Sequence, residues 1–265
     1  MRFIGATNVE LYFELRGNGD ALVLIPGFAS GAWSWSWQVD ELSESFRVIT
    51  FDPRGVSRSK MIEGVSVSIE SIADDIAEML DELSVEKAHV LGISFGGFVA
   101  QEFALRHPQR LNRLVLACTS FGGPGHVLPA PEVLAAFAST QGLNTRERIR
   151  QYLTTAFLPK FLETSAAAVE RFCDLREQNA VPPEVYEAQL YSATTFDVGE
   201  RVSSIEAETL IITGDRDSVV PMRNSVNLAA QITNARIEIV ENAGHMLFVE
   251  RAAEFNTVVK NFLAA

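Results

Sequence analysis

The sequence predicts an α/β fold in which helices flank a mostly parallel central sheet. Short apolar runs without polar alternation recur in the first half of the chain and again near its end, and such runs are typical of strands buried on both faces. Helix-like segments separate these runs, and that order requires crossover connections between parallel strands. Residues 122–204 contain no strand-like run, so we also expect a helical insertion.

The individual elements are predicted from runs that end at turns rich in glycine or proline. Residues 9–15 alternate as an edge strand does, and buried strands are expected at residues 21–25, 47–51, 88–91, 114–117, 210–213 and 237–240. Helices are expected at residues 69–83, 95–106 and 252–262 in the core, and at residues 131–139, 145–157, 164–178 and 183–194 in the insertion. Either Ser68 or Ser71 is suited to cap the first of these helices.

The composition excludes several classes of function. The chain of 265 residues carries 22 basic and 34 acidic side chains, a formal net charge of −12, whereas a nucleic-acid-binding surface needs clustered Lys and Arg. No apolar run approaches the length of a membrane span, and the first residues lack the apolar region of a signal peptide. We therefore expect no nucleic-acid partner, no membrane segment and a cytoplasmic location.

Neither cysteine indicates a metal or redox site. Cys118 and Cys173 lie outside any CxxC or Cys/His cluster. Two reduced, buried thiols are the expected state, and a single disulfide between them is the alternative. No group of His, Asp and Glu has ligand spacing, and no glycine-rich phosphate loop opens a helix. The sequence therefore predicts no metal and no organic cofactor.

A candidate nucleophile is Ser94, in the segment Gly92-Ile93-Ser94-Phe95-Gly96. This G-x-S-x-G pattern follows a predicted strand and precedes a predicted helix. Such a turn holds the serine in a strained conformation with its hydroxyl exposed, and the glycines let the two backbones approach each other. The pattern in this context favours nucleophilic catalysis by Ser94.

A nucleophilic serine needs a base, and His245 is the best candidate among the four histidines. It follows the last predicted strand, and open α/β sheets bind their ligands at the carboxyl ends of the strands. His89 lies within a predicted strand and His107 at a helix end, where structural roles are expected. His126, at the start of the insertion, is a weaker candidate.

The base in turn needs an orienting acid, which should lie between the serine and the histidine in the chain. Asp215 and Asp217 both follow the strand predicted at residues 210–213, so both qualify. For at least one of them, a structural role in the turn that follows the strand is an equally good explanation.

With these residues identified, the chain resembles the α/β-hydrolase fold family, in its form with a helical lid. The resemblance covers nearly the whole chain, and the motifs that carry it are Pro26-Gly27-Phe28, Gly92-x-Ser94-x-Gly96-Gly97, Gly214-x-x-Asp217-x-x-x-Pro221 and Gly244-His245. In the family's pattern the acid is the later aspartate, which implies a catalytic triad of Ser94, Asp217 and His245. The resemblance also implies a hydrolase core at residues 1–121 and 205–265, with a lid at 122–204 inserted after the sixth strand.

The resemblance further implies an oxyanion hole built from the backbone N–H groups of Phe28 and Phe95. Many relatives carry His-Gly where this chain has Pro26-Gly27, a change that alters local hydrogen bonding but keeps the backbone donor. Serine at position 94 excludes the haloalkane dehalogenases and epoxide hydrolases of this fold, which use Asp there.

Two other segments have alternative interpretations. Residues 52–59 resemble the family pattern D-x-R-G-x-G-x-S, with Ser57 at the last glycine position, and are expected to support the floor of the active site. A role for Arg54 as a clamp for a substrate carboxylate is the alternative. Three tryptophans are closely spaced: Trp33, Trp35 and Trp37. At least two of them are expected to pack in the core, and lining the substrate pocket is the alternative.

The lid is rich in aromatic side chains, most of which are expected to pack it onto the core. They are Phe137, Tyr152, Phe157, Phe161, Phe172 and Tyr191. An aromatic lid favours a substrate whose acyl or alcohol group is mainly apolar.

Together these features predict a serine hydrolase of small carboxylic esters or lactones, similar to the carboxylesterases and enol-lactone hydrolases of the family. Two alternatives stay open. One is a carbon–carbon bond hydrolase of ring-cleavage diketones that uses the same triad, and the other is a ligand-binding member of the fold without catalysis. The expected partner is a small ester or lactone substrate, and the sequence leaves the oligomeric state open.

Overall fold

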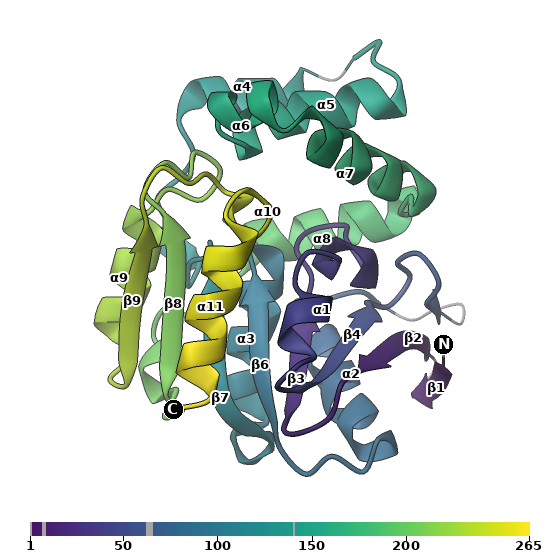
Figure 1. The fold of residues 1–265 in the computed structure, drawn as a ribbon, viewed down its shortest axis with the longest axis vertical. Coiled ribbons are helices and arrows are strands. Elements are labelled where there is room, and N and C mark those ends of the chain that lie inside the picture. Colours follow the sequence, from purple (N-terminus) through teal and green to yellow (C-terminus); the bar gives the residue numbers. More distant parts are fainter. Residues whose placement is uncertain (1, 7–8, 62–65, 140) are drawn as a thin grey trace.

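The central sheet has the predicted, mostly parallel arrangement. The computed structural model describes residues 2–6, 9–61, 66–139 and 141–265, and within them nine strands form one sheet (Figure 1). The strands are β1 (Arg2–Ala6), β2 (Val9–Arg16), β3 (Ala21–Ile25), β4 (Arg47–Asp52), β5 (Lys60–Met61), β6 (Ala88–Ile93), β7 (Leu111–Ala117), β8 (Thr209–Gly214) and β9 (Ala235–Val240).

The strand order is β1-β2-β4-β3-β6-β7-β8-β9, with β5 paired to β2. Neighbours from β4 through β9 run parallel, whereas β1, β2 and β5 form an antiparallel edge. The parallel strands therefore bring their carboxyl ends to one edge of the sheet.

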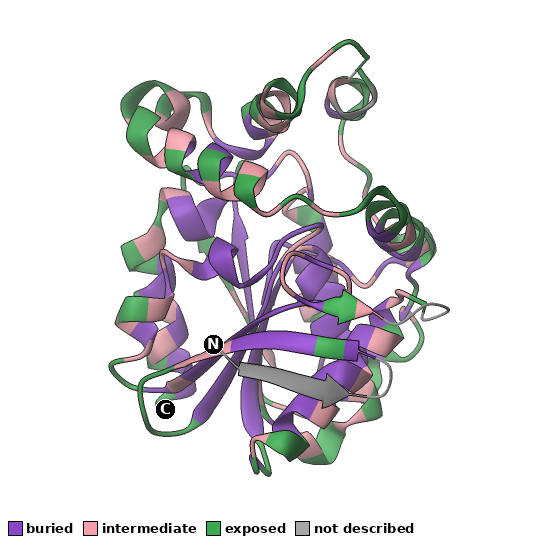
Figure 2. Cartoon of the chain, turned by 90° about the vertical axis from the view of Figure 1, so that its right-hand side faces the viewer, coloured by how far each residue is buried: buried purple, intermediate pink, exposed green. Residues whose placement is uncertain are grey.

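Helices cover both faces of this sheet, which explains the apolar runs without alternation. Figure 1 shows α1 and α11 in front of the sheet and α3 behind it. In β3, Val23 and Ile25 join the apolar cluster under α2 and α3, while Leu22 and Leu24 join the cluster under α11. Both faces of a parallel strand are thus buried (Figure 2). The helices outside the insertion are α1 (Val39–Leu42), α2 (Ile69–Glu82), α3 (Phe95–Arg106), α9 (Arg223–Gln231), α10 (Leu247–Glu250) and α11 (Ala252–Leu263).

Two helices illustrate where local sequence rules succeed and fail. Helix α2 begins at Ser68, whose side chain accepts a hydrogen bond from the Ser71 N–H while the Ser71 hydroxyl accepts one from the Ser68 N–H. Both candidate residues therefore take part in one capping box. Helix α9 was not predicted, because two of its three buried residues are the polar Asn224 and Ser225, so it lacks an apolar stripe.

Five helices occupy the predicted insertion between β7 and β8. They are α4 (Pro131–Ala138), α5 (Thr145–Ala156), α6 (Pro159–Thr164), α7 (Ala166–Gln178) and α8 (Pro183–Thr195). The insertion follows the seventh strand and not the sixth, because the structure adds β1 and the two-residue strand β5 to the five strands expected before residue 122. Figure 1 shows α4 to α7 beyond one end of the sheet.

The two ends of the insertion meet at a short stem. An antiparallel bridge joins Gly122 to Asp197, with hydrogen bonds from the Gly123 N–H to Phe196 O and from the Val198 N–H to Phe121 O. The helical segments therefore leave and rejoin the sheet at one place. No helix among the described residues is long and apolar enough to cross a membrane. Both cysteines are buried and free, which excludes the alternative disulfide.

Candidate active site

Ser94 lies at the turn between β6 and α3, in a conformation that L-residues rarely adopt. Its φ is 54° and its ψ is −118°, so the backbone there is strained. A Cβ on Gly92 would lie 2.1 Å from Gly96 O, and a Cβ on Gly96 would lie 2.3 Å from Ile25 O. Both positions of the motif therefore require glycine, and the sharp turn presents the Ser94 hydroxyl at the carboxyl end of the sheet.

The other two predicted catalytic residues lie beside Ser94. His245, in the loop after β9, has Nε2 3.1 Å from Ser94 Oγ and Nδ1 2.8 Å from Asp217 Oδ2. Asp217, in the loop after β8, accepts hydrogen bonds at Oδ1 from the backbone N–H groups of Val219 and Val220. The Asp217 carboxylate is fully buried and the imidazole nearly so. The three side chains form a continuous hydrogen-bonded chain that can move a proton from Ser94 to His245.

The two candidate aspartates occupy different environments. Asp215 is partly exposed and accepts a long hydrogen bond of 3.3 Å from the Ala243 N–H. It thus supports the loop that precedes His245, while Asp217 contacts the imidazole itself. This geometry separates two residues between which the local sequence alone could not choose.

Two backbone N–H groups near Ser94 are the expected oxyanion donors. Among the described residues, neither the Phe28 N–H nor the Phe95 N–H has a hydrogen-bond partner. A Cβ built on Gly27 would lie 3.8 Å from the Ser94 Cβ, so the Pro26-Gly27-Phe28 turn packs directly against the serine. Unpaired N–H groups beside a nucleophile can stabilise an oxyanion.

The inserted helices contribute an arginine that the sequence analysis missed. Arg176 in α7 donates from Nη1 to Phe28 O (3.2 Å) and Ser30 Oγ (2.8 Å), and its other guanidinium donors have no partner among the described residues. Burial lowers the pKa of Arg176, against the opposing effect of Tyr152 and Tyr186. Burial also raises the pKa of Tyr152 to about 12. A charged group is therefore held next to the turn without a carboxylate partner in the described chain.

The end of α5 is joined to both loops that carry the acid and the base. The Ser218 hydroxyl, next to Asp217, donates to Thr155 O at 2.6 Å, and the Met246 N–H, next to His245, donates to Ala156 O at 3.1 Å. These bonds fix the ends of both loops against the insertion.

Glu250 is a second residue that the sequence did not mark. Its carboxylate accepts hydrogen bonds from the Gly244 N–H (2.6 Å) and the Leu158 N–H (2.5 Å). Burial raises the pKa of Glu250, while these two backbone donors act in the opposite direction. Glu250 thereby holds the loop of His245 against the start of α6.

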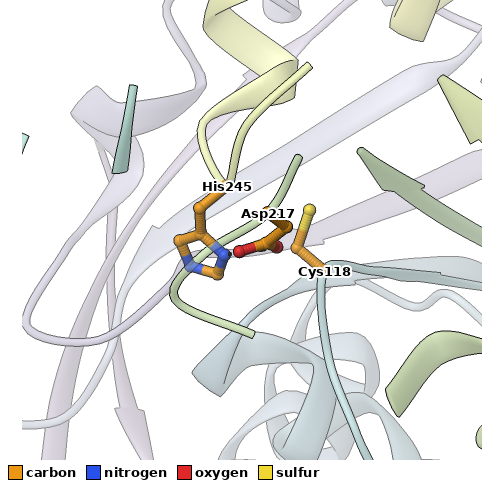
Figure 3. A group of neighbouring side chains, drawn as sticks. All are labelled: Cys118, Asp217 and His245. Atoms are coloured by element: carbon orange, nitrogen blue, oxygen red, sulfur yellow. Dashed lines mark hydrogen bonds and ion pairs between the residues drawn. The ribbon is translucent and has the colours of Figure 1, made fainter. Parts of the chain in front are cut away.

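Figure 3 shows Cys118 on the side of Asp217 opposite to His245. Its sulfur, a carboxylate oxygen of Asp217 and a ring nitrogen of His245 lie within 4.8 Å of one another, a group that could in principle hold a metal ion. Burial, followed by the charge of Asp217, raises the pKa of the Cys118 thiol well above its ordinary value. A protonated thiol is a poor metal ligand, and the imidazole and the carboxylate already bond to each other.

The remaining predicted residues have structural roles. Arg54 is buried, donates from Nε and Nη2 to both carboxylate oxygens of Asp75, and donates from Nη1 to Ser66 O. The alternative role of Arg54 as a substrate clamp is therefore wrong. Ser57 has a φ of 52°, which explains why the family pattern has glycine at that position.

The tryptophans pack in two directions. Trp35 is fully buried against Phe248, whereas Trp33 packs edge-on against Phe172 of α7, with ring centroids 5.3 Å apart. Trp37 contacts Phe172 as well. The expected core packing is correct for Trp33 and Trp35, and two of the three also contact the insertion.

Four of these aromatic side chains pack the insertion onto the core, as expected: Phe157 and Phe172 belong to the apolar cluster under α11, and Tyr152 and Phe161 pack against it. The Phe157 ring stacks on Phe161 and meets Phe172 edge-on, whereas Tyr191 is 70 % exposed. The side chain of Phe137 lies outside the described part of the chain.

Among the described residues, no hydrogen bond joins the other histidines to Ser94. The ring of His89 is buried in β6, that of His107 pairs with Asp74, and that of His126 bonds to the Ser120 hydroxyl.

Comparisons with known proteins agree with this fold. A model of the α/β hydrolase fold family matches residues 20–252. The chain is 31 % identical to a 2-hydroxymuconate semialdehyde hydrolase of Pseudomonas sp. strain CF600, over 99 % of this chain and 93 % of that protein. It is 28 % identical to a putative carbamate hydrolase, RutD, of Caulobacter sp. strain K31, over 96 % of each.

Among solved structures, a hydrolase from Pseudomonas aeruginosa PA01 superposes with a TM-score of 0.85 at 30 % identity, covering 100 % of this chain and 98 % of that one. The match spans core and insertion alike. The chain therefore belongs to the α/β hydrolase fold family, and it is a hydrolase.

Proposed function

We propose that this protein is a serine hydrolase that cleaves a small carboxylic ester or lactone through an acyl-enzyme on Ser94. The observation that carries the proposal is the position of Ser94 Oγ, 3.1 Å from His245 Nε2 and next to the unpaired N–H groups of Phe28 and Phe95. A base on one side and two donors on the other are what acyl transfer requires.

The proposed reaction begins when His245 Nε2 takes the proton of Ser94 and Oγ attacks the carbonyl carbon. Negative charge then develops on the carbonyl oxygen, where the Phe28 and Phe95 N–H groups would stabilise it. The tetrahedral intermediate collapses as His245 gives its proton to the leaving oxygen. A water molecule, activated by the same base, then releases the acid from Ser94. Asp217 holds the tautomer of His245 that has its proton on Nδ1.

We further propose that residues 122–204 form a lid and that the substrate carries a carboxylate. The donors of Arg176 that are not used by the Pro26–Ser30 turn could bind such a group. A carboxylate would also neutralise a charge that burial makes costly, which is consistent with the lowered pKa of Arg176. The rest of the lid, rich in aromatic rings, suits an apolar body for the same molecule.

A second candidate is a carbon–carbon bond hydrolase, which the relatives favour. The substrate named for the relative from Pseudomonas sp. strain CF600, 2-hydroxymuconate semialdehyde, contains a carboxylate and an aldehyde but no ester. The relative from Caulobacter is named for carbamates, in which an acyl carbon bonds to a heteroatom as in an ester. The same triad could serve either bond, so only turnover separates the two candidates.

Covalent labelling followed by turnover tests the proposal. A fluorophosphonate probe should label the wild type and leave Ser94→Ala unlabelled. A panel should then compare p-nitrophenyl esters, a lactone with a carboxylate, and 2-hydroxymuconate semialdehyde. Fastest turnover of the ester or lactone supports the first candidate, and fastest turnover of the semialdehyde supports the second. Absence of labelling would refute both and favour the ligand-binding alternative.

A further inference from the structure

The turn that carries one proposed oxyanion donor is held by side chains of the insertion. The Ala29 N–H donates to Gln189 Oε1 at 2.8 Å, across 160 residues of sequence. The carbonyl oxygen of Phe28 accepts from Arg176 Nη1 at 3.2 Å. These two groups are the two ends of one peptide unit, the Phe28–Ala29 peptide. Helices α7 and α8 therefore hold both ends of a single peptide plane.

That peptide needs external support, because Ala29 has a φ of 49°. A residue with a Cβ is strained in this region, and such a conformation persists only where its surroundings impose it. Gln189 is 1 % exposed, so water does not compete for its bond to Ala29. Without this bond, Ala29 could relax to a common φ only if the Pro26–Ser30 turn moved, and the Phe28 N–H in that turn would be displaced with it.

We propose that Gln189 is a positioning residue for the oxyanion hole: by holding the Phe28–Ala29 peptide it keeps the Phe28 N–H unpaired and directed at the oxygen bound beside Ser94. This inference rests on the proposed function, since it assumes that the Phe28 N–H is an oxyanion donor. It also gives the insertion a part in the chemistry, because the donor is in position only while α8 is seated on the turn.

Gln189→Met tests the inference, because methionine keeps the length of the side chain and removes the acceptor. Complete loss of one oxyanion donor lowers kcat by about 100- to 1,000-fold, and a loosened donor should lower it by about 10- to 100-fold. KM should change less than about threefold, because the oxyanion forms only in the transition state. Binding of a boronic acid, which forms a tetrahedral adduct on Ser94, should weaken as much as kcat falls. Binding of the planar product acid should not change.

Val185→Ala is the matched control on the same helix. Val185 is buried and contacts the backbone at Gly55, but it makes no polar contact with the turn. The control should lower the melting temperature and leave the ratio of boronic acid to product affinity unchanged. Gln189→Leu replaces Gln189→Met if the methionine variant does not fold.

Two results would overturn the inference. One is a kcat for Gln189→Met within twofold of the wild type. The other is a parallel change of kcat and KM that Val185→Ala reproduces, since this would reflect a loosened insertion and not a displaced donor. The tests with Gln189→Met and Val185→Ala presuppose that the fluorophosphonate probe labels Ser94 in the wild type. A wild type that does not label would refute the proposed function instead.

Discussion

Replacing Asp217 with asparagine should disable His245 without disturbing the fold. Asp217 Oδ1 accepts two backbone N–H groups, from Val219 and Val220, and so the oxygen of the new amide should remain there. The amide nitrogen then takes the place of Oδ2, 2.8 Å from His245 Nδ1. Because that nitrogen is a donor, it selects the tautomer with the proton on Nε2. Nε2 faces Ser94 Oγ and can no longer accept its proton.

The expected loss in kcat is about 10,000-fold, the size seen when a triad histidine is held in the wrong tautomer. At 1.36 kcal/mol for each factor of ten, this corresponds to about 5.5 kcal/mol of transition-state stabilisation. Asp215→Asn is the matched control, since it keeps an acceptor for the Ala243 N–H and does not contact the imidazole. We expect its kcat to remain within about threefold of the wild type.

The assay is steady-state turnover of whichever substrate is fastest in the panel, with the melting temperature as a check on folding. Equal losses for the two asparagine variants would refute the assignment of Asp217. A loss below tenfold for Asp217→Asn would refute the tautomer argument, even if Asp215→Asn were fully active.

Three further predictions concern strain, charge and pH. Ser94→Ala should abolish turnover. In denaturant unfolding, Ser94→Gly should be more stable than Ser94→Ala by about 1–2 kcal/mol, because glycine tolerates a φ of 54°. Equal stabilities of the two variants would show that the turn is not strained. Arg54→Met should lower the free energy of unfolding by about 3–5 kcal/mol, since it leaves the buried Asp75 carboxylate unpaired. The double variant Arg54→Met/Asp75→Leu should recover part of that loss. If its loss instead equalled the sum of the losses of the two single variants, the ion pair would not contribute to stability. Burial lowers the pKa of His89 from 6.5, so the folded state favours the neutral ring. The contribution of His89 to the free energy of unfolding is therefore present above pH 6.5 and is lost as the pH falls through the folded-state pKa. His89→Leu should therefore reduce the drop in melting temperature between pH 7.5 and pH 5, and an unchanged drop would contradict it.

The parts of the site that the sequence predicts are those fixed by local backbone geometry. Gly92 and Gly96 mark the Ser94 turn because each lacks room for a Cβ. His245 and Asp217 follow strands directly, so their positions along the sheet edge follow from strand order. Asp215 and Asp217 are only two positions apart, and the structure distinguishes them by burial and by the contact of Asp217 to the imidazole.

The residues that the sequence does not reveal act across long sequence separations. Arg176 and Gln189 lie in ordinary helical segments, and nothing in their neighbourhood indicates a contact with residues 28–30. Glu250 similarly depends on where the loop of Gly244 meets Leu158. Such contacts depend on how the insertion docks, and docking is decided by side-chain packing that no local pattern records.

The contacts of the insertion argue against a lid that swings away as one rigid flap. The end of α5 bonds to Ser218 and Met246, the neighbours of the acid and the base, while α7 and α8 hold the Phe28–Ala29 peptide. Opening the whole insertion would break each of these bonds and would release the proposed donor, acid and base loops together. Helix α4 differs, since within the described part of the chain the Gln151 side chain of α5 donates hydrogen bonds to it, and no hydrogen bond joins it to the catalytic loops. We therefore expect the end of α5, α7 and α8 to remain part of the site throughout turnover, with any opening of the insertion confined to α4.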